Sequence, residues 1–435
     1  MKTMIANSRV TSPSTRLAVA AFATMGSIYF FSYFQRVAVP GTIFNEVQTD
    51  LALSAAAVAA LGSMFTWIYG GAQVVVGLLA DRYGGVRTLL GGGLAMLAGA
   101  VAFPLAHTAG SLFAARALTG FGASFMYLSI VKELDRLFGH RHFTVWLGVT
   151  LAIGYSGGMA GTLPFERAAA AFGWRHALLA VAGLLAVALA TAGLVLRRLG
   201  PEPRATRPLS VAPLFEVFRQ RRGWPLLASS FIQFPVFFVI QTVLGKKFLQ
   251  DFGGLNSPAA AGFILIMTAV SALSVVLGGY MPRLLGERRR PWLLAGALVL
   301  LAATATLLTG TLVRAPGWVF LLGYILLAIA GVSQPSGTAT IKELNRPESV
   351  AAAISVYNGL AYIGCGTIGQ VGGWLLGCYS GAAIVTAAGV VYPPAAYTAL
   401  CCFLTALAGL NMVFVLLVPE TRGTSLVLED TPATA

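Results

Sequence analysis

The sequence predicts an all-α membrane protein with twelve transmembrane helices arranged in two pseudo-symmetric six-helix bundles. The first observation is composition: of 435 residues, 57% are hydrophobic and 10% are charged, against roughly 25% charged in a soluble domain. The second is that apolar runs of about 20 residues, the length needed to cross a bilayer, recur along the whole chain. A water-soluble fold is therefore excluded, and no room remains for a large soluble domain.

The helices are delimited by glycine, proline and clusters of charge, which interrupt the apolar runs. We expect the first six at 17–45, 52–80, 86–106, 110–134, 143–166 and 174–196. We expect the second six at 224–250, 258–281, 291–312, 316–344, 349–378 and 396–418. Segment 380–395 receives no assignment.

The first apolar run begins at Leu17, after a polar segment that contains Lys2, Arg9 and Arg16. This beginning resembles a signal peptide, but the run is too long and no small-residue cleavage site closes it. We therefore expect it to be the first transmembrane helix, entered from a cytoplasmic N-terminus.

The basic residues indicate how the chain crosses the membrane. A net charge of +14 raises the question of a nucleic-acid partner, because clustered cations release counterions from phosphates. Here they lie in short gaps between apolar runs, 22 on the side of the N-terminus and five on the other. The positive-inside rule then predicts a multi-pass protein of the cell (inner) membrane with both termini cytoplasmic, and no nucleic-acid partner.

A polar linker and an internal repeat divide the chain into two halves. Residues 197–223 are polar and proline-rich, which predicts an N-terminal bundle over 1–196 and a C-terminal bundle over 224–435. VKELDR at 131–136 returns as IKELNR at 341–346, at the end of the fourth helix of each half. Duplicated halves related by an axis along the membrane normal are typical of transporters.

Several motifs then suggest a family. The loop from Gly77 to Arg87, with Asp81, Arg82 and Gly84 inside it, resembles the signature loop of the major facilitator superfamily. Matching segments are RALTGFG at 116–122, GWR at 173–175 and PETRG at 419–423. The resemblance covers essentially the whole chain and implies a secondary transporter that works by alternating access.

Within that superfamily, YFQR at 33–36 resembles the organophosphate:phosphate antiporter and anion:cation symporter branches. These branches carry Tyr-x-x-Arg in the first helix and an arginine in the fourth, and they move organic anions. The resemblance therefore implies an anionic substrate.

Two arginines fall inside predicted membrane helices. A guanidinium costs roughly 2.5 to 3.5 kcal/mol at the centre of a bilayer helix, so Arg36 should face an aqueous cavity or a partner. Arg116 has two interpretations: a substrate ligand, or a structural residue that binds the backbone of neighbouring helices. Polar and aromatic residues from the central parts of other helices complete a predicted substrate site that comprises Arg36, Tyr33, Arg116, Gln73, Gln241, Gln334, Tyr357, Asn358 and Tyr362.

A predicted gate involves charges at the cytoplasmic ends of helices. We expect Arg82 to pair with Glu133 or Asp135; the alternative is that these charges only mark the membrane boundary. The predicted gating set is Asp81, Arg82, Arg87, Glu133 and Glu343. If a proton is coupled to transport, Glu133 and Glu343 are its candidate carriers.

We therefore predict a secondary active transporter of a small organic anion bearing a carboxylate or phosphate. The alternative is an exporter, or a carrier of amino acids, other zwitterions or drugs, driven by a proton gradient. A transporter-like receptor is a third class. No enzyme constellation, cofactor motif or metal-ligand spacing is found, and the four cysteines are interpreted as small buried hydrophobes. The expected partners are the substrate, a coupling proton or ion and the lipid bilayer, with the protein acting as a monomer.

Overall fold

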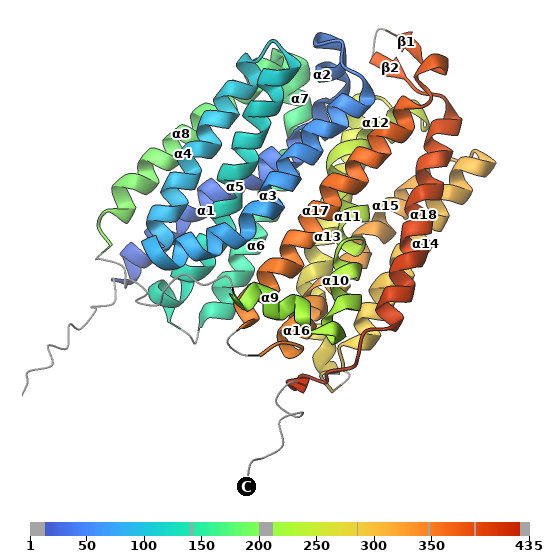
Figure 1. The fold of residues 1–435 in the computed structure, drawn as a ribbon. Coiled ribbons are helices and arrows are strands. Elements are labelled where there is room, and N and C mark those ends of the chain that lie inside the picture. Colours follow the sequence, from blue (N-terminus) through green and yellow to red (C-terminus); the bar gives the residue numbers. More distant parts are fainter. Residues whose placement is uncertain are drawn as a thin grey trace, which may run out of the picture.

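The computed structural model describes residues 14–139, 142–199, 212–284, 286–346, 349–386 and 389–426. Long helices run side by side along one direction (Figure 1). We call one end of the molecule the linker end, where α1 begins, α9 lies and α18 ends. The opposite end, with α2, α7 and strands β1 and β2, is the hairpin end.

The helices follow the predicted order in both halves. The N-terminal half contains α1 (Thr15–Ala38), α2 (Phe44–Asp50), α3 (Ala55–Tyr83), α4 (Gly85–Leu105), α5 (Ala109–Phe138), α6 (Phe143–Ala160), α7 (Leu163–Phe172) and α8 (Trp174–Leu196). The short helix α9 (Ala212–Arg219) precedes the C-terminal half. That half contains α10 (Trp224–Ser230), α11 (Gln233–Val239), a π-helical turn (Ile240–Leu244), α12 (Gly245–Asp251), α13 (Ser257–Leu284), α14 (Arg290–Val313), α15 (Gly317–Ile329), α16 (Gln334–Glu343), α17 (Val350–Gly377) and α18 (Pro394–Leu416).

The all-α membrane fold is confirmed. Eleven segments within the described residues are long and apolar enough to span a membrane. The twelfth expected helix, at 143–166, consists of α6 and α7 with a break at Gly161 and Thr162. Residues 200–211 of the expected linker lie outside the described residues, so the boundaries of the two halves stay predictions.

Four helices that we expected to be continuous are interrupted. The breaks lie in the segments expected at 17–45, 143–166, 224–250 and 316–344. Each contains a proline at or shortly after the interruption, and proline lacks the amide hydrogen that would continue the preceding helix. These prolines are Pro40, Pro164, Pro235 and Pro335.

Segment 380–395 forms a short antiparallel hairpin of β1 (Ile384–Thr386) and β2 (Gly389–Val391), which the sequence did not predict. Asp251, the last residue of α12, binds two residues that follow this hairpin in the sequence. Its carboxylate accepts hydrogen bonds from the Tyr397 hydroxyl (2.6 Å) and the Tyr392 amide (3.0 Å), and pairs with Lys247 at 3.0 Å. The hairpin is therefore tied to the C-terminal bundle.

The repeated Lys-Glu-Leu segments place similar glutamates near the start of the third helix of each half. Glu133 on α5 is 2% exposed and pairs with Arg136 at 3.1 Å. It lies over the first residue of α4, because a Cβ on Gly85 would fall 2.6 Å from its carboxylate. In the C-terminal half, Glu343 pairs with Arg289, which immediately precedes α14, at 3.0 Å.

A second glutamate, Glu420, caps α14. Its carboxylate accepts hydrogen bonds from the backbone amides of Arg289 (2.8 Å) and Arg290 (3.1 Å). The first amides of a helix have no intrahelical partner and carry a partial positive charge, so a carboxylate there is stabilising. The segment after α18 is thereby fixed to the start of α14.

The two bundles meet closely along α3 and α17, where glycines allow the backbones to approach. A Cβ on Gly70 would lie 2.8 Å from the carbonyl oxygen of Gly359, and one on Gly373 would lie 2.3 Å from the Cβ of Ala59. A Cβ on Gly366 would lie 2.4 Å from the indole ring of Trp67. These contacts extend from the middle of the molecule to the hairpin end.

The hairpin end is closed by further contacts between the bundles. A Cβ on Gly41 would lie 2.4 Å from the backbone carbonyl oxygen of Thr242. The buried ammonium of Lys246 donates a hydrogen bond to the carbonyl of Thr42. Two side-chain bonds add to this closure, from Asn45 to Gln250 (3.4 Å) and from Gln48 to Tyr392 (3.2 Å).

Candidate functional site

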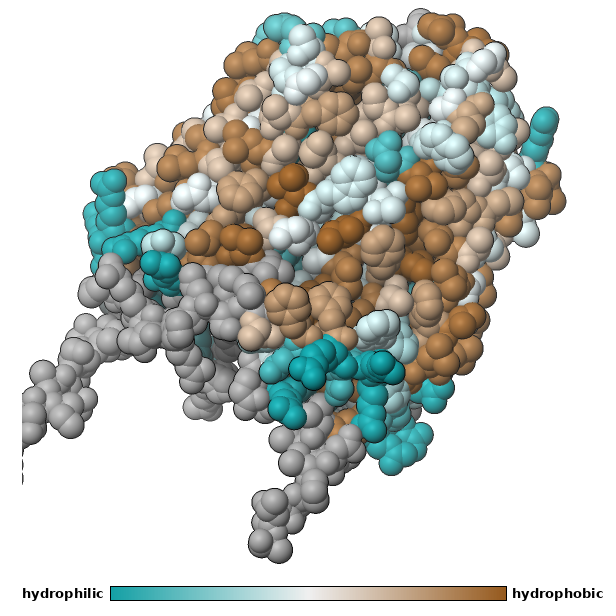
Figure 2. All heavy atoms as spheres, viewed as in Figure 1, coloured by the Kyte–Doolittle hydropathy of each residue, from teal (hydrophilic) through white to brown (hydrophobic). Residues whose placement is uncertain are grey.

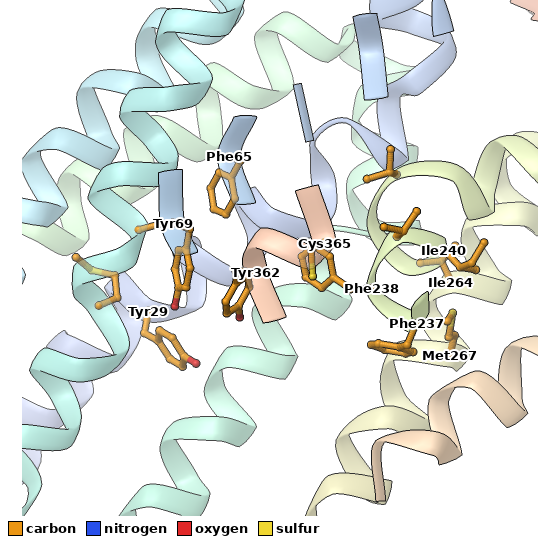
Figure 3. Packing of buried hydrophobic residues seen from close by; sticks show 14 of the residues in the cluster. Tyr29, Phe65, Tyr69, Phe237, Phe238, Ile240, Ile264, Met267, Tyr362 and Cys365 are labelled. Carbon is orange, nitrogen blue, oxygen red and sulfur yellow. The ribbon is translucent and has the colours of Figure 1, made fainter. Parts of the chain in front are cut away.

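Arg36 lies in the last turn of α1, is 3% exposed, and is surrounded by aromatic rings. Its guanidinium carbon is 4.5 Å from the ring centroid of Tyr33, 4.7 Å from that of Tyr69 and 5.1 Å from that of Tyr362. We call Arg36 and these three residues the tyrosine cage. Tyr33 precedes Arg36 by three residues and so shares its face of α1. Tyr69 and Tyr362 come from α3 and α17 and lie side by side where the bundles meet (Figure 3).

The hydrogen-bonding capacity of Arg36 is only partly used. Nη1 donates to the Tyr362 hydroxyl at 2.5 Å, whereas Nε and Nη2 are buried without a partner. Among the residues that the structure describes, no carboxylate forms an ion pair with Arg36. Ring faces attract a cation, but unpaired buried N–H groups still carry a desolvation cost. Arg36 therefore retains the capacity to bind an anion.

Arg116 on α5 is bound to the backbone of α1. Nη1 donates to the carbonyl of Gln35 at 3.0 Å and Nη2 donates to the carbonyl of Val39, while the Phe65 ring covers the guanidinium carbon at 4.3 Å. The last carbonyls of a helix have no intrahelical partner, so Arg116 satisfies them where α1 ends. Of the two interpretations that the sequence left open, this geometry favours the structural one.

Arg116 also contributes to the electrostatics of the cage. It is buried, and it lies close enough to Arg36 for the two positive charges to repel each other. Two buried cations in one neighbourhood give that region a positive potential, and a low-dielectric surrounding strengthens it. An anion that entered the cage would relieve this repulsion.

We expect Arg116→Met to destabilise the protein by about 1–3 kcal/mol per buried carbonyl left without a donor. The carbonyls concerned are those of Gln35 and Val39. The measurement is the melting temperature of the purified protein, with Arg167→Gln, at an exposed position of α7, as the control. A melting temperature equal to that of the wild type would contradict the structural role.

Gln73 on α3 follows Tyr69 by one helical turn and is 1% exposed. Neither atom of its amide group has a hydrogen-bond partner. Buried amides are nearly always paired, so this side chain indicates a place where a bound molecule or water belongs. Ser32 and Gln35 on α1 also have buried polar atoms without partners, and the sequence analysis did not select them.

The other predicted ligands lie outside the tyrosine cage. Gln241, in the π-helical turn, donates to the Thr268 hydroxyl at 2.9 Å. The Tyr357 hydroxyl lies against α16, because a Cβ on Gly337 would fall 2.2 Å from it. Gln334 and Asn358 are half-buried, at the start of α16 and on α17. The structure therefore brings together Arg36, Tyr33 and Tyr362 of the predicted set and adds Tyr69.

The surroundings of the predicted gating residues are described only in part, so the gate stays a prediction. Glu133 pairs with Arg136 of its own helix, while Arg82 is exposed with its guanidinium carbon 5.5 Å from the ring of Tyr83. Arg87 is also exposed, and the side chain of Asp81 lies outside the described residues. At this end of the two helices, the ammonium of Lys132 on α5 donates to the carbonyl of Ala80 in the last turns of α3.

Comparison with known families decides the class of protein. The sequence pattern of the Major Facilitator Superfamily matches residues 25–369, most of the chain. The protein belongs to this superfamily. A search of curated protein sequences finds no match. As a major facilitator, the chain is a multi-pass membrane protein and a secondary transporter rather than an enzyme.

Solved structures of other major facilitators share the fold. A bacterial homologue of the human lysosomal transporter Spinster, inward-facing and unoccupied, is 17% identical with a TM-score of 0.72, over 97% of this chain and 100% of that one. A POT family transporter in complex with 5-aminolevulinic acid is 15% identical with a TM-score of 0.76, over 92% and 95%. The nucleoside transporter NupG is 13% identical with a TM-score of 0.71, over 93% and 100%. At these identities the similarity concerns the fold alone.

Proposed function

We propose that this transporter carries a small organic anion bearing a carboxylate or phosphate, with Arg36 as its main electrostatic ligand. The observation that carries the proposal is that two buried nitrogens of the Arg36 guanidinium group, Nε and Nη2, have no partner. A guanidinium binds two oxygens of a carboxylate or phosphate in a planar fork. The unpaired amide of Gln73 supplies a further donor and acceptor on α3.

The cage also provides a link between binding and movement. The hydroxyl of Tyr362, from the C-terminal bundle, accepts a hydrogen bond from Arg36, which belongs to the N-terminal bundle. An anion bound to Arg36 competes with that hydroxyl and changes the contact between α1 and α17. Because a ligand shifts a conformational equilibrium through its different affinities for the two states, substrate binding at this position biases the opening of the bundles.

The proposal includes an orientation. With both termini in the cytoplasm of a cell with an inner membrane, as the distribution of basic residues predicts, the hairpin end lies on the side of the membrane away from the cytoplasm. In this orientation the end away from the cytoplasm is the closed one, and we expect the transporter to act as a monomer. Coupling to a proton or another ion, as a symporter or an antiporter, belongs to the same proposal.

Two measurements on the purified full-length protein test the substrate class. A thermal-shift screen with carboxylates, phosphate esters, zwitterions and cationic drugs identifies ligands, because a compound that binds the folded state raises its melting temperature. Counterflow in proteoliposomes then shows whether a ligand is transported. Anions should stabilise the protein and exchange. Counterflow of cationic drugs alone would overturn the proposal, amino-acid counterflow would establish the zwitterion alternative, and saturable binding without flux would indicate a receptor.

A further inference from the structure

The short helix α9 presents an apolar face to the outside of the molecule. Val217 is buried against the C-terminal bundle, whereas Phe215 is 67% exposed and Phe218 is 47% exposed. Trp224, at the start of α10, is also exposed and donates from its indole nitrogen to the carbonyl of Phe218 at 2.8 Å. Aromatic side chains in this position are typical of the boundary between lipid tails and headgroups.

Charged and polar side chains lie directly beside this apolar face. Figure 2 shows hydrophilic atoms gathered at the linker end, below a broad hydrophobic belt. A cavity of about 390 Å³ opens between the end of α9 and residues 344–346 and 349, which follow α16 and precede α17. Its lining residues are Glu216, Arg219, Gln220, Leu344, Asn345, Arg346 and Ser349.

The charge of this cavity favours an anion. Arg219 and Arg346 approach it from two different elements and are both exposed. Among the described lining residues, Glu216 is the acidic one, and it accepts a hydrogen bond from the Ser349 hydroxyl. Gln220 donates to the carbonyl of Leu344 at 3.2 Å. The two guanidinium groups are therefore the main charged donors that face an incoming molecule.

We propose that this cavity binds the headgroup of an anionic glycerophospholipid, whose acyl chains lie along Phe215 and Phe218. A phosphate between two arginines matches the charge, and a basic amphipathic helix at the membrane surface attracts anionic lipids. The exposed aromatic rings beside the cavity explain why the ligand is a lipid rather than a free anion. This site is separate from the tyrosine cage and does not depend on the proposed substrate.

The lipid would stabilise a particular part of the transporter. The bonds from Gln220 to Leu344 and from Ser349 to Glu216 join α9 to the end of α16 and to the residue before α17. Helix α17 carries Tyr362 of the tyrosine cage. A headgroup held by Arg219 and Arg346 therefore links the linker helix to the helix that faces Arg36 across the bundles.

The experiment uses the purified full-length protein in detergent, titrated with phosphatidylglycerol or phosphatidylcholine and followed by native mass spectrometry. We expect one phosphatidylglycerol to bind about tenfold more tightly than phosphatidylcholine, the preference that two arginines at a surface provide. The double variant Arg219→Gln with Arg346→Gln should lose this preference. The matched control, Arg197→Gln with Arg198→Gln, removes the same charge from exposed positions at the linker end and should keep it.

Two results would overturn the lipid site: equal binding of the two lipids by the wild type, or the same loss of preference in the control. A further arm uses inorganic phosphate. If phosphate at millimolar concentration raises the melting temperature as much as phosphatidylglycerol does, and Arg219→Gln with Arg346→Gln removes that rise, the cavity binds a free anion and the proposal fails. Melting curves without lipid show whether each variant is folded. If the double variant does not fold, the single variant Arg219→Lys takes its place. Because lysine keeps the charge, this variant should retain part of the preference for phosphatidylglycerol.

Discussion

Replacing Arg36 by alanine should abolish transport of the anion while leaving a folded protein in the membrane. The variant removes Nε and Nη2, the two unpartnered nitrogens of Arg36, and hydrogen bonds to a charged group contribute about 1.5–3 kcal/mol each. Affinity for the anion should therefore fall about a hundredfold or more. Folding should survive because the structure describes no carboxylate that the change would leave buried without its partner. The measurement is counterflow in proteoliposomes, beside the melting temperature.

Three further variants make this test specific. Arg36→Lys keeps the positive charge but loses the planar fork, so it should retain weak transport that saturates only at higher anion concentration. Tyr362→Phe keeps the ring but removes the hydroxyl that competes for Arg36, so it should bind the anion at least as tightly as the wild type. Arg167→Gln removes an exposed positive charge at the hairpin end and should transport normally. Normal transport by Arg36→Ala would reject the assignment of the substrate site.

The second large effect is expected at Gly41. The Cβ of a valine at this position would lie 2.4 Å from the backbone oxygen of Thr242. A backbone atom cannot move aside as a side chain can. Overpacking of this kind costs about 1–3 kcal/mol, which changes a two-state ratio by about 5- to 150-fold. Because the clash exists only while the hairpin end is closed, Gly41→Val should favour the state in which this end is open.

Cysteine labelling measures this shift. In a variant without the native cysteines, a cysteine at Gln48, which is buried between the bundles, should react several-fold faster with a maleimide when Gly41→Val is present. Gly183→Val is the control, because a Cβ at Gly183 meets nothing within 4 Å. Gly373→Ala, which opposes Ala59 across α3 and α17, provides an independent wedge if Gly41→Val does not fold. Unchanged labelling in both wedge variants would contradict the closed hairpin end.

Most of the fold could be predicted from the sequence because hydropathy determines which segments span the membrane. The expected segment 174–196 coincides with α8, and 291–312 differs from α14 by one residue at each end. The interruptions were harder to place, because a proline indicates a break but does not show whether the chain resumes in the same direction. The hairpin at 384–391 is too short for a periodic signal.

The candidate site could be predicted only in part. The cost of a charge in the bilayer identified both Arg36 and Arg116, but it does not distinguish a guanidinium with unpaired N–H groups from one bound to carbonyls. That distinction depends on where α1 ends relative to α5. Tyr69 was one of many aromatic residues in apolar helices, and its role depends on the packing of α3 against α17, which no local pattern records.

The closed hairpin end has a consequence for how easily the two bundles separate. The ion pairs described above each lie within one bundle: Lys247 with Asp251 and Arg289 with Glu343, for example. The hydrogen bonds between the two bundles at the hairpin end, such as those donated by Gln48 and Lys246, each have an uncharged acceptor. The bond from Gln48 joins uncharged groups and contributes little in net terms, whereas the bond from the Lys246 ammonium contributes about 1.5–3 kcal/mol. The two bundles can therefore separate and re-associate at the hairpin end without breaking an ion pair described here, while each half keeps its own shape.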